Sequence, residues 1–174
     1  MTVAREAFPV PRGWSIAMAA AGPVAIGGIL AARAHDASPM LAAPAIVFGV
    51  VAATGPALYI AMAAAGHAPP LAAVVRAFGV ALGAFGVALA GLILPVAFAA
   101  ASSVASSTTV VATTSAVAGA GYLGLRRLAA ELKTGRTSTP GAALAGSAVF
   151  AIWAIATATI AGRLWWDLAV EVAS

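Results

Sequence analysis

Long apolar runs separated by short polar segments are the main pattern of this chain. The hydrocarbon core of a bilayer, about 30 Å thick, takes about 20 apolar residues of helix. The apolar residues surround any helix drawn through these runs, which is typical of helices in lipid. The pattern predicts five spans, at residues 14–32, 41–65, 71–100, 108–125 and 141–164. We therefore expect an all-α, polytopic transmembrane helical bundle that forms a single integral membrane domain, residues 1–174.

Proline and hydroxyl residues set the limits of these spans. The second span is followed by Gly66–Pro70, a run that cannot continue a helix. The third span, at 30 residues, is longer than one crossing requires, so it tilts, projects from the membrane or bends near Pro95. The fourth span is the least apolar, because Thr113, Thr114 and Ser115 lie inside it. The first span also fits a signal peptide, but we expect it to be retained.

Composition supports a membrane protein and excludes several classes of site. Hydrophobic residues make up 63% of the chain and charged residues 8%, whereas a soluble domain has about 25% charged residues. A water-soluble fold could not cover its surface with so few charges. Cysteine is absent, which excludes disulfides, thiolate metal sites and a cysteine nucleophile. The net charge is +4, but the basic residues are scattered rather than interleaved with aromatics, so we expect no nucleic-acid binding.

The basic residues instead indicate an orientation, because lysine and arginine accumulate on the cytoplasmic side of a membrane. Five crossings place seven of the nine basic residues on the side of the N-terminus: Arg5, Arg12, Arg76, Arg126, Arg127, Lys133 and Arg136. The other side holds Arg33 and Arg163. We therefore expect a cytoplasmic N-terminus and an external C-terminus in the cytoplasmic (inner) membrane.

The third span contains a near-perfect heptad repeat, residues 77–83 followed by 84–90. Gly79 and Gly83 form a G-x-x-x-G step, and Gly86 and Gly91 follow on neighbouring turns. Helices in lipid associate where small residues let their backbones approach. The pattern predicts a helix-packing face, whose partner is either another helix of this chain or another subunit.

Aromatic and basic residues near the ends of the spans are expected to anchor the protein at the membrane interfaces. Trp14 lies at one end, and Trp165 and Trp166 lie at the other, where aromatic belts form. Arg76 lies about one turn into the third span, from which its side chain can extend to the interface. The alternative for Arg76 is a contact with a substrate or a lipid phosphate.

A basic cytoplasmic loop follows the fourth span and contains Arg126, Arg127, Lys133 and Arg136. We expect it to extend the helix along an anionic lipid surface, where each basic residue contributes about 1 kcal/mol. It is also the largest soluble surface on which a partner could bind.

The sequence predicts no catalytic or metal site and indicates no class of cofactor. All five acidic residues lie in loops or near the ends of spans: Glu6, Asp36, Glu131, Asp167 and Glu171. A proton relay or hydrolase would need ionisable residues inside the membrane. His35 and His67 lie on opposite sides and cannot share a metal ion. The hydroxyl-rich run from Ser102 to Ser115 either lines a polar pore or forms caps and interhelical hydrogen bonds.

The second and third spans resemble the small five-span bacterial membrane proteins related to the Yip1 family. The similarity covers about half of the chain and rests on Gly55-Pro56-Ala57-Leu58-Tyr59, the proline-bearing turn and the glycine-rich helix that ends at Leu94-Pro95. It implies five spans, a cytoplasmic N-terminus and protein partners, and it implies no catalytic residues.

These observations favour a non-enzymatic integral membrane subunit, or a scaffold of a membrane protein assembly. Its expected partners are the lipid bilayer and either other membrane protein subunits or copies of itself in an oligomer. The alternative is a small transporter or channel whose pathway forms between protomers, using the hydroxyl-rich run and a break near Pro95.

Overall fold

The computed structural model describes residues 12–66, 69–102, 105–133 and 140–173. Within these residues the chain forms five helices and no strand. They are α1 (Arg12–Ala34), α2 (Ser38–Ala64), α3 (Leu71–Ser102), α4 (Ser106–Lys133) and α5 (Pro140–Ala173). The expected all-α helical bundle is confirmed.

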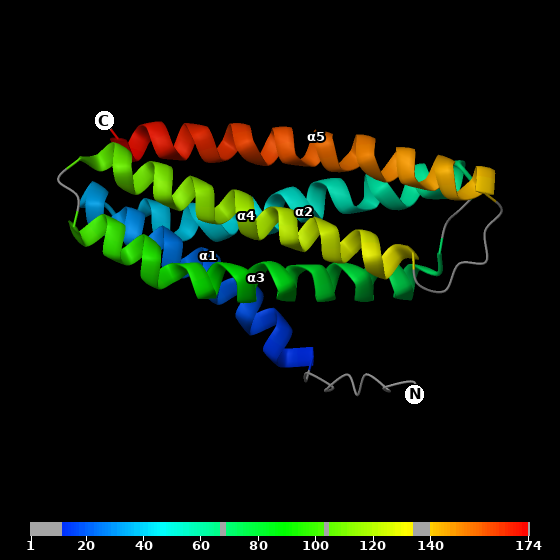
Figure 1. The fold of residues 1–174 in the computed structure, drawn as a ribbon, viewed down its shortest axis with the longest axis horizontal. Helices are drawn as coiled ribbons and strands as arrows, with labels where there is room; N and C mark the ends of the chain where they lie inside the picture. Colours follow the sequence, from blue (N-terminus) through cyan, green and yellow to red (C-terminus); the bar gives the residue numbers. More distant parts are fainter. Residues whose placement is uncertain (1–11, 67–68, 103–104, 134–139, 174) are drawn as a thin grey trace.

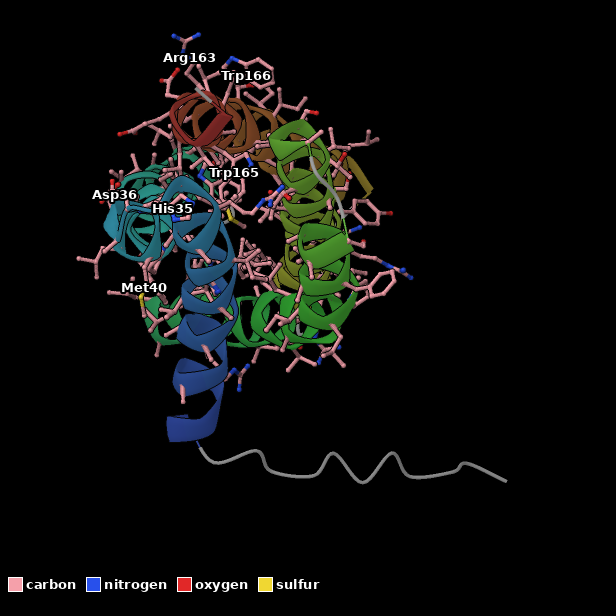
Figure 2. The ribbon with its side chains drawn as sticks, turned by 90° about the vertical axis from the view of Figure 1, so that its left-hand side faces the viewer. His35, Asp36, Met40, Arg163, Trp165 and Trp166 are labelled. Atoms are coloured by element: carbon pink, nitrogen blue, oxygen red, sulfur yellow. The ribbon has the colours of Figure 1, made fainter. Side chains whose placement is uncertain are left out.

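Seen from its end, the bundle has its helices arranged in a ring (Figure 2). Around the ring their order is α1, α2, α5, α4 and α3, and the α4–α5 pair makes the least extensive of these five contacts. One end of the bundle, here called the Asp36 end, holds the α1–α2 and α3–α4 connections. The opposite Lys133 end holds the α2–α3 and α4–α5 connections. Helix α1 is inclined to the others, and its N-terminal end projects past α3 (Figure 1).

Glycines allow three close helix crossings. A Cβ atom on Gly22 of α1 would lie 3.1 Å from the Leu89 Cβ of α3. A Cβ on Gly27 of α1 would collide with the Pro39 carbonyl oxygen and lie 2.8 Å from the Met40 Cα of α2. A Cβ on Gly124 of α4 would lie 3.2 Å from the Phe85 Cβ of α3. These positions fix where α1 crosses α2 and α3, and where α4 crosses α3.

The buried side chains form two hydrophobic clusters, one toward each end. The cluster toward the Asp36 end draws on all five described helices and includes Ile26, Ala43, Leu89, Ala116 and Trp165. The cluster toward the Lys133 end draws on α2 to α5 without α1, and includes Leu58, Val74, Leu128 and Trp153. Helix α1 therefore completes only one of the two clusters.

Two indole hydrogen bonds set the position of α5 along its neighbours. The Trp153 Nε1–H donates to the Thr54 carbonyl oxygen of α2 at 2.7 Å. The Trp165 Nε1–H donates to the Thr114 hydroxyl of α4 at 2.9 Å. Because α4 and α5 run antiparallel, these bonds define which residues of the two helices lie at the same depth in the bundle.

Three helical segments of the described chain are long and apolar enough to cross a membrane: Ser38–Ala64, Leu71–Ser102 and Leu144–Val172. Ala19–Ala34 of α1 is apolar but shorter, and α4 is long but less apolar. Large hydrophobic side chains also cover much of the outer surface, including Leu94, Phe98, Ile152 and Ile155. These features indicate a membrane protein.

One boundary differs from those expected for the spans. Helix α3 runs through Pro95 to Ser102, close to the expected end at residue 100, and its proline removes only one helical hydrogen bond. Helix α4 continues beyond Leu125, the expected end of the fourth span, as far as Lys133, so that Arg126 and Arg127 extend the helix. The charged segment is therefore an extension of the helix with a fixed direction.

Candidate functional site

The candidate site is the outer face of α4, which we define as Thr108, Ser115, Gly119 and Tyr122. All four residues are exposed. The three hydroxyl residues recur every seven positions, which places them on one side of the helix. The opposite side is buried and includes Gly124, where α3 approaches closely. The sequence of α4 thus places hydroxyls on both sides of the helix, and those of the outer face are exposed.

The hydroxyl-rich run from Ser102 to Ser115 does not line a single surface. Thr109 and Thr113 are buried, and the Thr113 hydroxyl donates to the Thr109 carbonyl oxygen at 2.9 Å. The Ser102 hydroxyl donates to the Phe98 carbonyl oxygen at 2.7 Å. Ser115 points outward, whereas Thr114 accepts the bond from Trp165. Three hydroxyls of the run therefore bond to backbone carbonyl oxygens or to an indole. The exposed Thr108 and Ser115 belong to the outer face of α4.

Two buried hydroxyl groups have no hydrogen-bond partner in the described part of the chain. They belong to Thr109 of α4 and Thr157 of α5. Thr157 lies one turn after Trp153, on the inward side of α5. The Thr54 hydroxyl, by contrast, donates to the Val50 carbonyl oxygen four residues earlier at 2.8 Å. Either threonine would need a different χ1 rotamer to make the same bond.

Trp165 and Trp166 were both expected to anchor the protein at the interface, and the structure separates them. Trp165 is 7% exposed and points in among the helices, whereas Trp166 is 60% exposed and points away (Figure 2). Adjacent residues on a helix are about 100° apart, so both indoles cannot face lipid. The interface role is thus left to Trp166, and Trp165 is a buried hydrogen-bond donor. Trp14 lies in the first turn of α1.

Sequence reasoning did not identify Trp153, which joins three helices. Besides its bond to Thr54, its ring packs edge-on against Phe78 of α3, with centroids 5.9 Å apart. Phe150 lies 5.8 Å from it on α5 itself. The sequence does contain a signal for this role. An indole N–H in the middle of a span is away from water, so it needs a hydrogen-bond acceptor on a neighbouring helix.

The four glycines predicted to form a packing face do not share one neighbour. Gly86 is buried, and its carbonyl oxygen would lie 3.3 Å from a Cβ on Gly22 of α1. A Cβ on Gly79 or Gly91 would meet nothing within 4 Å, and Gly83 is half-buried. Because α1 crosses α3 at an angle, it covers Gly86 and leaves Gly79 without a close neighbour.

The described charges are distributed unevenly between the two ends. The Lys133 end carries Arg76, Arg126, Arg127, Lys133 and one acid, Glu131. Arg127 pairs with Glu131 at 2.9 Å, and Arg76, Arg126 and Lys133 are exposed. The Asp36 end carries Arg33, Arg163, Asp36, Asp167 and Glu171, and Arg163 pairs with Asp167 at 3.3 Å. Arg136 lies outside the described residues.

The turn between α1 and α2 contains His35 and Asp36, which lie at the end of the bundle that faces the viewer in Figure 2. His35 has a φ of 53°, and the Asp36 amide donates to the Ala31 carbonyl oxygen at 3.3 Å. The Ser38 hydroxyl and amide donate to the Asp36 carboxylate, and these bonds lower the pKa of Asp36. This arrangement ends α1 and begins α2.

No metal site is formed by the described residues, which contain no group of three or more His, Cys, Asp or Glu side chains placed to hold an ion. His67 lies outside the described residues.

Comparison of the chain with protein-family models, with curated proteins and with solved structures found no match in any of the three.

Proposed function

We propose that the chain is a non-enzymatic integral membrane subunit that binds other membrane proteins, or copies of itself, through the outer face of α4. The observation that supports this proposal is the polarity of that face. On the neighbouring helices, Phe98 of α3 and Ile152 and Ile155 of α5 present large apolar side chains outward. Helix α4 also exposes two aliphatic side chains, Val111 and Leu123, but hydroxyls and a glycine lie between them.

Packing physics favours a protein neighbour for this face over lipid. Without a hydrophobic driving force, helices in a bilayer associate through small residues and interhelical hydrogen bonds. Ser115 and Gly119 are four residues apart, and a Cβ on Gly119 would meet nothing within 4 Å. A second helix can therefore approach the α4 backbone closely at this point. A hydroxyl that faces acyl chains makes no interhelical hydrogen bond and no close contact with another backbone.

The proposed topology has five spans, with the N-terminus in the cytoplasm and the C-terminus outside an inner membrane. The concentration of basic residues at the Lys133 end supports a cytoplasmic location for that end. Helix α4 crosses the bilayer in this arrangement because protein covers both of its faces.

Cysteine crosslinking tests the proposal directly, because the natural chain contains no cysteine. Ser115→Cys places a single thiol on the outer face of α4, and Ile155→Cys places one on α5, where the side chain is 69% exposed. We expect a short bismaleimide to crosslink the first variant in membranes and not the second. A product of twice the chain mass identifies a second copy, and another mass identifies a different subunit. Equal behaviour of the two variants would reject the proposed face.

A small transporter or channel is the second candidate function, and the same outward hydroxyls favour it. Thr108, Ser115 and Tyr122 would line a polar pathway if a neighbouring protomer closed over them. Such a pathway would make Ser115→Cys reactive toward charged, membrane-impermeant thiol reagents and would give solute flux in liposomes. A crosslinked but unreactive Ser115→Cys without flux supports the subunit alone.

A further inference from the structure

Arg126 lies deeper along the bundle than the other exposed basic residues of the Lys133 end. Arg126 is 12 residues after Thr114 on α4, and Trp153 is 12 residues before its partner Trp165 on α5. Arg126 and Trp153 are therefore at one depth. Lys133 is seven residues further along α4, which is about 10 Å closer to the end of the bundle.

The close contact between α3 and α4 gives the same alignment. Gly124 lies against Ala81 and Phe85 of α3. Counting outward along both antiparallel helices places Lys133 near Val74 and thus close to the depth of Arg76. Arg76 and Lys133 together indicate where lipid headgroups begin on this side of the protein. Arg126 lies about 10 Å below that level.

Neighbouring helices are apolar at the depth of Arg126. Ile152 and Ile155 of α5, on either side of Trp153, are 70% and 69% exposed. Their side chains require acyl chains at the depth where α4 presents a guanidinium group. The ordinary remedy is for the arginine side chain to extend toward the interface. On a helix, however, the Cα–Cβ bonds tilt toward the N-terminus, and the N-terminus of α4 lies at the other end of the bundle. To reach the interface level, the Arg126 side chain would have to extend against this tilt over about 10 Å.

The described basic residues of the Lys133 end outnumber its described acids. Glu131 is the one acid described at this end, and it bonds to Arg127. Arg126, Ala130 and Lys133 are spaced by four and three residues, so they lie along one side of α4 and all three are exposed. Lys133 thus faces outward at the level of the headgroups, and Arg126 faces outward on the same side of α4 at a deeper level.

We infer that Arg126 and Lys133 form a binding site for the phosphate of an anionic phospholipid, which is drawn inward along α4 below the level of its neighbours. Charge complementarity identifies the occupant, because an anionic headgroup supplies the negative charge that the described residues do not. The assignment to the cytoplasmic leaflet rests on the proposed topology, whereas the site itself does not. The bilayer is locally thinned beside α4 as a result.

Native mass spectrometry of the purified full-length chain tests the site. The protein is titrated in detergent with phosphatidylglycerol and, separately, with phosphatidylcholine. The unmodified chain should retain phosphatidylglycerol preferentially. At about five-fold in affinity per basic residue, the Arg126→Gln/Lys133→Gln variant should lose more than ten-fold in phosphatidylglycerol affinity and keep its phosphatidylcholine affinity.

Two further variants make the result decisive. Arg33→Gln/Arg163→Gln removes the same net charge at the opposite end and should change the phosphatidylglycerol affinity less than about two-fold. Arg126→Lys/Lys133→Arg keeps both charges and should keep the affinity, which separates loss of the site from loss of the fold. The inference is overturned if the unmodified chain does not distinguish the two lipids, or if both charge-removing variants lose equally. Neither result would alter the outcome of crosslinking at Ser115.

Discussion

Trp165 and Trp166 show how one residue step changes the role of a side chain. The sequence gives two adjacent indoles, but only one faces outward, and the other donates to Thr114 at 2.9 Å. Which of the two turns inward depends on the rotation of α5, and that rotation is set by contacts with helices distant in the sequence.

The hydrogen bond of Trp165 should contribute measurably to stability. Trp165→Phe keeps an aromatic ring but removes the donor, and we expect a loss of about 0.5–1.5 kcal/mol, near the lower value in a membrane environment. Unfolding by increasing SDS in mixed micelles measures the change. Trp166→Phe, at the exposed position, is the matched control and should leave the midpoint unchanged. Equal losses in the two variants would show that the buried bond has no special weight.

The turn between α1 and α2 should weaken in acid because of Asp36. Bonds from Ser38 lower the pKa of Asp36 in the folded state. The stabilisation is therefore complete above the unfolded-state pKa of about 3.9 and is lost as the pH falls through the lower folded-state value. Thermal unfolding of the natural chain and of Asp36→Asn should show a difference that shrinks below about pH 4. A difference that stays constant across this range would contradict the assignment to Asp36.

At the scale of helices, the apolar runs correctly predict that the second and third helices exist and approximately where they begin and end. The second span, expected at 41–65, is observed as Ser38–Ala64, and the third, expected at 71–100, as Leu71–Ser102. The proline-rich turn sets these ends locally, so sequence is sufficient. The end of α4 was harder to predict, because the local sequence from Arg126 to Lys133 is compatible with either a loop or a helix.

The candidate site was predictable only in part. Thr113, Thr114 and Ser115 identified α4 as the least apolar span, but which hydroxyls face outward depends on the approach of α3 at Gly124. The depth of Arg126 could not be inferred either, because it follows from the alignment of α4 with α5 through Trp165 and Thr114. Such alignments join residues far apart in the chain, and no local pattern encodes them.

The crossing of α1 and α2 offers a matched pair of glycines. A Cβ on Gly27 would collide with the backbone of Pro39, whereas one on the adjacent Gly28 would meet nothing within 4 Å. Gly27→Ala should therefore destabilise the protein by about 1–3 kcal/mol through overpacking. Gly28→Ala should be neutral or stabilise by up to about 1 kcal/mol, because alanine favours helix. The same SDS titration compares them, and similar midpoints would show that α1 and α2 do not cross at this contact.

For the whole molecule, the five crossings that we propose would place the two chain ends in different compartments. Since the chain lacks cysteine, a cysteine added before Met1 or after Ser174 is the sole thiol. A membrane-impermeant maleimide applied to spheroplasts should label the C-terminal thiol at once and the N-terminal thiol only after lysis. Labelling of both thiols in intact spheroplasts would reject the odd number of crossings.

The two hydrophobic clusters differ in how far their folding depends on the first helix. Among the described side chains, the cluster toward the Lys133 end contains none from α1, whereas the cluster toward the Asp36 end includes Ile26 and Leu30. A chain that lacked its first helix would keep the buried contacts of the cluster toward the Lys133 end and would expose part of the cluster toward the Asp36 end. We therefore expect damage to the first helix to disorder one end of the bundle and leave the other end folded.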